Sequence, residues 1–524
     1  MTSRKYARLI ASLGLVLALG LALAGPTLAQ TQQQQPPEYK EVLAASRIAD
    51  ASARLKEFNR IKAAYPFSVM METVESFIQN ARIELAPSLD AVLELQKVFL
   101  GQGLGARRAT SYLQAASQIL QHPKVTSFNR AKVLDAILQY RSASEKAAKD
   151  ADTFVDIPKE EERQAFALFL SNAFLIVSAK AQIFAGNAPS AVIALDAYRA
   201  AGGALDNDYY DILGDAQFRM GNEKEAYQAY LRAAVDNAKG ATEKAKMLYA
   251  KLTGKEDGFD DALEAQMKKL PYEPEAYEPS ADWKGKAVLA EIFTGSECPP
   301  CVGADLGFDG LIEAYPAKYL AVLEYHLPIP APDPMMNPAT KKRQAYYGVN
   351  STPTVVIDGS NKTVGGGTRG MSGGKFMQYK AAIDPKTMEA PAVELKLSAG
   401  LSGDVVTAAF SSDITVPGTD YVVVLVQKEE VYRGSNGLPF HKMVVRDMLT
   451  IDPEKTKMAT FDLAASERAT DAYLTEFEKT YTRIPNFRFA QRHAVIARKG
   501  LRVVFFAQDR TSKRILNAIV ADIK

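Results

Sequence analysis

The stretch VLAEIFTGSECPPC, residues 288–301, decides the fold of this chain. Its first half is apolar and predicts a buried strand, which a short turn follows. Residues 302–315 then have the apolar spacing of a helix. Cys298 and Cys301, the two cysteines among 524 residues, therefore stand where a strand passes into a helix. We expect Cys298 at the N-cap and Cys301 in the first turn, because Pro299 suits the first helical position.

A Cys-x-x-Cys pair at such a junction is typical of thiol-disulfide exchange. The positive end of the helix dipole favours the thiolate of Cys298, which is the predicted nucleophile, and Cys301 is the predicted resolving thiol. Glu297 opposes this effect, because a neighbouring negative charge disfavours a thiolate. The pair therefore predicts a reductase or isomerase rather than an oxidase, and we expect no cofactor.

A second motif follows downstream, where residues 346–359 read YYGVNSTPTVVIDG. Together with the cysteine pair, this turn, proline, strand and turn resembles the thioredoxin family over residues 283–386. The resemblance implies a thioredoxin-like α/β fold. It also implies that Pro353 is cis and lies against the cysteine pair, where Thr352 and Pro353 would bind an extended client segment.

Glu291 lies on the strand before the cysteine pair, close to where the thioredoxin family carries a buried acid. The loop that follows is one residue longer here, so two interpretations stay open. In one, Glu291 serves Cys301 as a general base. In the other, Glu291 is a surface acid on a strand edge.

Residues 41–270 are rich in Ala, Leu, Lys, Glu and Gln at helical spacing and predict an all-α domain. In the second half, a Gly-Asn turn followed by small residues recurs after 35 residues, as at Ala191 and Ala226. Around Gly214 and Tyr230 the pattern resembles the tetratricopeptide repeat family. The resemblance implies a concave surface that recruits a partner, and a plain helical bundle is the other interpretation.

The remaining segments complete the predicted fold class. Prolines break the helical pattern in residues 271–282, which predicts a linker before the thioredoxin-like domain at residues 283–389. From residue 390 to residue 524, short alternating and β-branched runs predict an antiparallel β-sandwich domain. The predicted chain is multidomain: an all-α helical repeat domain, an α/β thioredoxin-like domain and a C-terminal β-sandwich.

Residues 1–29 have the layout of a secretory signal peptide, with a basic start, an apolar run of 16 residues and small residues up to Ala29. An uncleaved anchor helix is the other interpretation. The Gln-rich start of residues 30–40 predicts a flexible tether. No further apolar run looks long enough for a membrane span, so we expect a periplasmic or secreted protein without a span after signal cleavage.

Composition argues against several classes of partner. The chain has 63 Lys plus Arg and 61 Asp plus Glu, which leaves no strong field for nucleic acid. Its four histidines show no ligand spacing, so we predict no metal site. The glycine-rich residues 365–374 fail the spacing of a phosphate loop and predict a mobile loop.

The proline-rich residues 327–338, with two methionines, predict either an adaptable rim for a client chain or a rigid connector.

These features predict an exported thiol-disulfide oxidoreductase that acts on protein disulfides and exchanges electrons with a redox partner protein. The competing interpretation is a non-enzymatic binding or scaffold protein, in which the helical repeats and the β-sandwich surround a thioredoxin-like core. The enzyme is favoured, because the cysteine pair stands in the structural context that its chemistry needs.

Overall fold

The computed structural model describes residues 36–101, 106–150, 157, 159–235 and 240–523. The predicted signal peptide, residues 1–29, and the first part of the predicted tether lie outside these residues. The chain forms two compact units that divide between Gly203 and Ala204. The helical segment predicted at residues 41–270 is therefore shared between both units.

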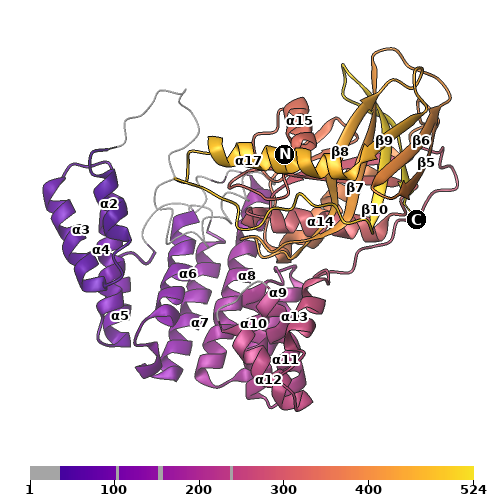
Figure 1. The fold of residues 1–524 in the computed structure, drawn as a ribbon. Helices are drawn as coiled ribbons and strands as arrows, with labels where there is room; N and C mark the ends of the chain where they lie inside the picture. Colours follow the sequence, from indigo (N-terminus) through magenta and orange to yellow (C-terminus); the bar gives the residue numbers. More distant parts are fainter. Residues whose placement is uncertain (1–35, 102–105, 151–156, 158, 236–239, 524) are drawn as a thin grey trace. The chain divides into compact units, whose positions relative to one another are not determined.

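The first unit is all-helical where the structure describes it (Figure 1). Polar caps begin several of its helices: Asp50 accepts a hydrogen bond from the Ala53 N–H, which would otherwise have no partner. Gly186 ends α8 with a φ of 88°, a backbone conformation that favours glycine. The helices are α2 (Tyr39–Ser46), α3 (Ala51–Ala64), α4 (Met71–Leu85), α5 (Leu89–Gln96), α6 (Ala106–Gln121), α7 (Arg130–Ala147), α8 (Glu160–Ala185) and α9 (Ala188–Ala200).

Helix α8 is long and apolar enough to cross a membrane, by length and composition alone. The expectation that no further run reaches this length was therefore wrong. In the structure, Phe166, Leu170 and Phe174 are buried in the apolar core that α8 shares with α7. A helix in the core of a bundle meets the same test of composition.

The second unit begins with helices that pack in close pairs. A Cβ atom on Gly214 would lie 2.5 Å from the ring of Tyr230, so α10 and α11 can approach this closely only with glycine at that position. The small and aromatic positions of the sequence pattern thus do bring two helices together. The helices are α10 (Asn207–Arg219), α11 (Glu223–Val235), α12 (Ala241–Thr253) and α13 (Phe259–Met267).

The predicted linker, residues 271–282, is packed against the region that follows it. The Tyr272 hydroxyl donates to the Leu306 carbonyl at 2.8 Å. The Tyr277 ring stacks on Tyr315 with centroids 4.7 Å apart. These contacts fix the proline-rich segment along the α/β region, so it does not act as a free tether.

A mixed eight-stranded sheet forms the centre of the second unit, in the order β11-β10-β7-β8-β2-β1-β3-β4. Strands β1 and β2 are parallel, β3 pairs antiparallel with β1, and β4 pairs antiparallel with β3. On the other side, β8 pairs with β2 in parallel through Glu324 and Val444, and the outer strands are antiparallel. The strands are β1 (Val288–Thr294), β2 (Leu320–His326), β3 (Thr354–Ile357), β4 (Asn361–Val364), β7 (Thr419–Val431), β8 (Phe440–Ile451), β10 (Leu501–Asp509) and β11 (Ile515–Asp522).

The C-terminal strands differ from the separate β-sandwich domain that we predicted at residues 390–524. Four of them extend the sheet of residues 283–389, because β8 pairs with the edge that β2 would otherwise expose. The other three form a small antiparallel sheet that packs on β7 and β10, with the Phe410 and Phe505 rings 5.0 Å apart. These three strands are β5 (Leu395–Ser402), β6 (Val405–Ser412) and β9 (Met458–Asp462).

Helices cover both faces of the large sheet (Figure 1). On one face, the Thr294 hydroxyl of β1 donates to Asp305 of α14 at 2.6 Å. Glu291 lies three residues before Thr294 on β1, so its side chain points to the opposite face of the sheet. There it binds Arg343 of α15. The cysteine pair is on the side of α14. The helices are α14 (Val302–Ala314), α15 (Pro338–Tyr347), α16 (Ser372–Thr387), which packs on α14, and α17 (Leu463–Thr480), which contacts α15.

Candidate redox site

The two cysteines form a disulfide at the start of a helix, with their Cα atoms 5.3 Å apart. Cys298 precedes a short 3₁₀ turn, Pro299–Cys301, which continues into α14 at Val302. The predicted passage from strand to turn to helix is confirmed, with a 3₁₀ first turn in place of an α-helical one. The cysteine pair thus lies at the carboxyl end of β1 and the amino end of α14.

The predicted client-binding residues lie beside the cysteine pair. The Thr352-Pro353 peptide is cis. The Thr352 hydroxyl is 3.4 Å from Cys298 Sγ and 2.7 Å from the Ile329 carbonyl oxygen. The hydroxyl has one proton, so it donates to one of these two acceptors at a time. The structure therefore brings Thr352 and Pro353 together with Cys298, as the resemblance implied.

Both sulfur-bearing side chains are buried. Cys298 and Cys301 are 0% exposed, although the two prolines between them are exposed. Three segments from other parts of the chain are attached around this turn. Each of them is hydrogen-bonded to a residue next to or between the two cysteines, or within two residues of them.

The first segment is the loop at residues 327–338. Asp333 Oδ2 accepts hydrogen bonds from the Ser296 N–H at 2.6 Å and from the Ser296 hydroxyl at 2.9 Å. The same oxygen lies 2.9 Å from Nδ1 of His326. Both methionines of the loop are fully buried, which favours the rigid connector over the adaptable rim for a client chain. The loop is therefore held beside the cysteine turn by the hydrogen bonds of Asp333.

The second segment is the turn between β7 and β8, residues 432–438. The carboxylate of Glu297 accepts from the Tyr432 hydroxyl at 3.3 Å and from the Ser435 N–H at 3.2 Å. Burial, together with the charge of Glu297, raises the pKa of Tyr432 to about 12. The acid next to Cys298 therefore also attaches the C-terminal strands to the cysteine turn.

The third segment is the glycine-rich loop. The Gly367 N–H donates to the Pro300 carbonyl at 2.7 Å, and the Gly367 carbonyl accepts from the Gly303 N–H at 2.8 Å. A Cβ atom on Gly366 would lie 1.7 Å from the Pro300 oxygen, so no larger residue fits there. The loop is attached to the cysteine turn and is not the mobile loop that we predicted.

Glu291 occupies neither of the two places that its sequence position suggested. It is 0% exposed, and its carboxylate binds Arg343 through Nε at 2.6 Å and Nη2 at 2.8 Å. The hydroxyls of Tyr347 and Tyr325 donate to it at 2.7 and 3.0 Å. Glu291 therefore faces α15, on the side of the sheet away from Cys301. This geometry corrects both the general-base and the surface-acid interpretations.

The acid that shares a helix face with Cys301 is Asp305, four residues later. Its Oδ2 atom is buried and has no hydrogen-bond partner among the described residues. Burial, and then the charge of Glu324, raise the pKa of Asp305 well above its ordinary range. We did not single out Asp305 from the sequence. The available signal was a carboxyl group within the otherwise apolar first turns of the predicted helix.

A cluster of buried polar side chains is formed by Glu324 and His326 on β2 and His441 on β8. Asp333 links His326 of this cluster to Ser296, two residues before Cys298. His326 Nε2 is 2.8 Å from Glu324 Oε1. Burial opposes protonation of His326, but Asp333 and Glu324 outweigh this effect and raise its pKa to about 10. The sequence showed no ligand spacing, because the two strands are far apart along the chain.

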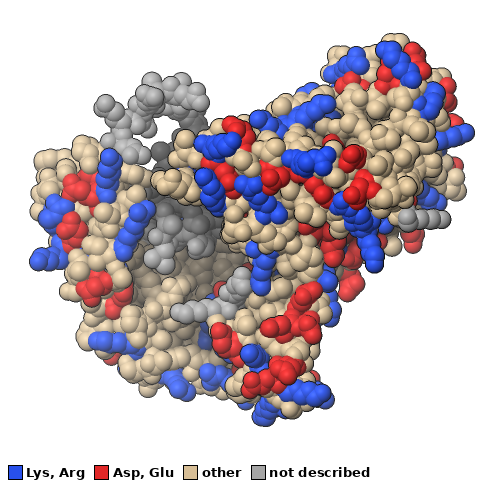
Figure 2. Space-filling view, viewed as in Figure 1, with Lys and Arg blue, Asp and Glu red and all other residues tan. Residues whose placement is uncertain are grey.

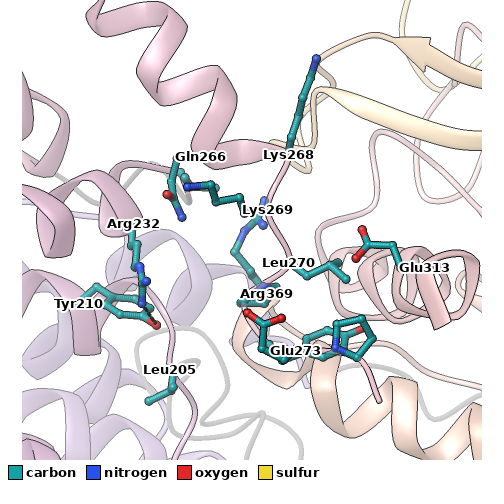
Figure 3. Close-up of a pocket in the computed structure, with 14 residues that line it drawn as sticks. Leu205, Tyr210, Arg232, Gln266, Lys268, Lys269, Leu270, Glu273, Glu313 and Arg369 are labelled. Carbon is teal, nitrogen blue, oxygen red and sulfur yellow. Dashed lines mark hydrogen bonds between the residues drawn. The ribbon is translucent and has the colours of Figure 1, made fainter. Parts of the chain in front are cut away.

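A pocket of about 490 Å³ lies elsewhere in the second unit and contains none of the predicted site residues (Figure 3). The Arg232 guanidinium stacks over the Tyr210 ring at 5.2 Å. Lys268 points away from the pocket and toward Phe440, 4.3 Å from that ring. Both positive and negative side chains line the pocket, so its charge does not indicate one class of ligand. The charged lining residues are Arg232, Lys268, Lys269, Glu273, Glu313 and Arg369.

Positive and negative side chains are interspersed over the face of the molecule in Figure 2. This distribution agrees with the formal net charge of +2. The surface charge therefore does not indicate a function, and the functional assignment rests on the cysteine pair. No protein-family model, no curated protein and no solved structure matches this chain.

Proposed function

We propose that the protein is a thioredoxin-like thiol-disulfide oxidoreductase that acts on protein disulfides outside the cytoplasm. The observation that carries the proposal is the Cys298–Cys301 disulfide at a strand-to-helix junction, with the Thr352 hydroxyl 3.4 Å from Cys298 Sγ. Such a pair exchanges two electrons with other thiols. Export is supported by the signal-like residues 1–29 and by the persistence of disulfides in oxidising compartments.

The reaction begins with the reduced pair. The Cys298 thiolate attacks one sulfur of a client disulfide, a mixed disulfide forms, and the other client sulfur leaves as a thiolate that takes up a proton. The Cys301 thiolate then attacks Cys298 Sγ, which restores the intramolecular disulfide and releases the second client thiol. The client gains two electrons and two protons, and the pair is oxidised. A dithiol redox partner returns the electrons by the reverse exchange.

Burial of the pair imposes a condition on this reaction. A client sulfur reaches Cys298 only when one of the three covering segments moves aside. The turn at residues 432–438 is the best candidate, since its attachment through Glu297 is partly exposed, whereas Asp333 is fully buried. The proposal therefore includes an opening step before the exchange.

Trapping of mixed disulfides tests the proposal. In the full-length chain, Cys301→Ala is expected to hold clients covalently on Cys298, because the resolving thiol is absent. Non-reducing electrophoresis and mass spectrometry of the adducts measure the trapping, and insulin reduction by the unaltered protein measures turnover. The variant with both cysteines replaced by Ala is the matched control and should trap nothing.

The same experiment separates the enzyme from the scaffold. A scaffold would hold clients, if at all, without a covalent bond and independently of Cys298. Absence of both adducts and insulin reduction would therefore reject the enzyme and leave the disulfide as a structural bond.

We expect Glu297→Ala to speed the opening step. Two hydrogen bonds from Tyr432 and Ser435 to a partly exposed carboxylate are together worth about 1–2 kcal/mol, so their loss should make reduction of the disulfide by dithiothreitol roughly tenfold faster. Stopped-flow or quenched thiol labelling measures this rate. Glu429→Ala, an exposed acid on the same hairpin, is the control. Equal rates for both variants and the unaltered protein would show that this turn is not the gate.

A further inference from the structure

The buried cluster at the junction of β2 and β8 has the donor atoms of a metal site. One ligand atom each from Glu324, His326 and His441 lies within 4.8 Å of the others. His326 Nε2 is 2.8 Å and His441 Nδ1 is 3.7 Å from the same Glu324 oxygen, Oε1. Tetrahedral zinc with bonds of 2.0–2.2 Å separates its ligand atoms by about 3.4 Å. The observed distances lie on either side of that value.

Each imidazole is held by its other nitrogen. Nδ1 of His326 faces the carboxylate of Asp333 at 2.9 Å, and Nε2 of His441 faces the Tyr432 carbonyl at 3.0 Å. Metal-binding histidines are oriented in this way by carboxylates and backbone carbonyls, which fix the ring and the tautomer. The two remaining nitrogens point to the same carboxylate oxygen, so the three donors converge.

A fourth oxygen is present on the same side of the sheet. Asp305 accepts from Thr294, whose partner in the parallel register is His326. Its Oδ2 atom is buried and has no hydrogen-bond partner within the described part of the chain. A buried carboxyl oxygen without a partner is costly, and a cation nearby would offset that cost.

The cluster also lies where the large sheet has its shortest strand pairing, between β2 and β8. Strands β2 and β8 are in register at the Glu324 and Val444 pair alone in the described sheet, and two ligands come from one strand and one from the other. Met443, two residues after His441, has a φ of 56°, which is uncommon for methionine. A metal ion here would join the half of the sheet that carries the cysteines to the C-terminal half.

We propose that Glu324, His326 and His441 bind a divalent zinc-type ion, with a water as the fourth ligand. Two imidazoles and one carboxylate are a set that zinc accepts in proteins. Neither cysteine takes part, so the site is independent of the proposed oxidoreductase. Because all three ligands are buried, the ion would enter as the chain folds.

Metal content and cobalt spectra test this proposal. The full-length chain is produced in cells grown with added Zn²⁺ or Co²⁺, kept oxidised, and passed over a chelating resin before elemental analysis. We expect about one equivalent of metal per chain and a visible d–d absorption in the cobalt form. His441→Ala and the near-isosteric Glu324→Gln should each retain less than about a tenth of the metal. Asp333→Asn should bind about 10–100-fold more weakly in competition with a chelator.

Two controls make the result specific. His493→Ala removes a buried histidine that binds Glu430, outside the cluster, and should leave the metal content unchanged. The variant with both cysteines replaced by Ser should also keep its metal, which excludes zinc bound by a reduced cysteine pair. A metal-free unaltered protein, equal metal in a folded Glu324→Gln variant, or loss of metal with the cysteines would each overturn the proposal. The cluster would then be a hydrogen-bonded group of a histidine and two carboxylates.

Discussion

Replacing Arg343 by Met lowers the free energy of unfolding by about 3–5 kcal/mol, because a buried carboxylate then loses its counter-charge. Glu291 is 0% exposed and Arg343 is 3% exposed, so no solvent is at hand to replace the lost interaction. The remaining donors to Glu291 are the neutral hydroxyls of Tyr325 and Tyr347. Equilibrium unfolding in urea, followed by far-ultraviolet circular dichroism, measures the change.

A double-mutant cycle shows whether the charge is the cause. Replacing both partners, Glu291→Leu with Arg343→Met, should recover most of the loss, since an apolar pair of similar volume is often as stable as a buried ion pair. Lys342→Met, an exposed neighbour on α15, is the control and should change stability by less than about 0.5 kcal/mol. A loss from Arg343→Met as small as that of the control would contradict a charged, unsolvated Glu291.

The local chemistry of the cysteine site was predictable from the sequence. A strand, a cysteine cap with proline at the first helical position, and a later Thr-Pro strand are all local patterns, and each acts within a few residues. The structure accordingly has Cys298 before a helical turn. The cis peptide at Pro353 was implied by the resemblance to the thioredoxin family and not by a local pattern. The position of Glu291 was not predictable in this way. A strand alternates its side chains between two faces, so an uncertainty of one residue in the loop was enough to leave its side undecided.

The long-range features of the site could not be predicted from one sequence. The alternating and β-branched runs predict strands after residue 390, but they do not say that β8 pairs with the free edge of β2. That pairing alone brings His441 to His326 and the turn at residues 432–438 to Glu297. The glycines after β4 were visible in the sequence, but the need for them follows from the carbonyl of Pro300, which a different segment supplies.

Gly366→Ala should disrupt the cysteine turn and lower the free energy of unfolding by about 2–4 kcal/mol. Its Cβ atom would lie 1.7 Å from the Pro300 oxygen and 2.8 Å from Cγ of Pro353, so the loop must separate from both. Overpacking of this kind costs about 1–3 kcal/mol, and loss of the Gly367 N–H bond to Pro300 adds about 1 kcal/mol. Urea unfolding measures the loss, and the rate of disulfide reduction by dithiothreitol should rise at least tenfold as the cover is lost.

Gly374→Ala is the matched control, because it lies a few residues later and its Cβ atom would meet nothing within 4 Å. Gly374 stands within α16, so alanine there should leave stability unchanged or raise it by up to about 1 kcal/mol. The comparison of the two variants shows whether Gly366 is needed because the Pro300 oxygen leaves no room for a Cβ atom. If Gly366→Ala unfolds at the same urea concentration as Gly374→Ala and its disulfide is reduced no faster, the glycine loop does not cover the cysteine pair. Access to Cys298 would then depend on the other two segments alone.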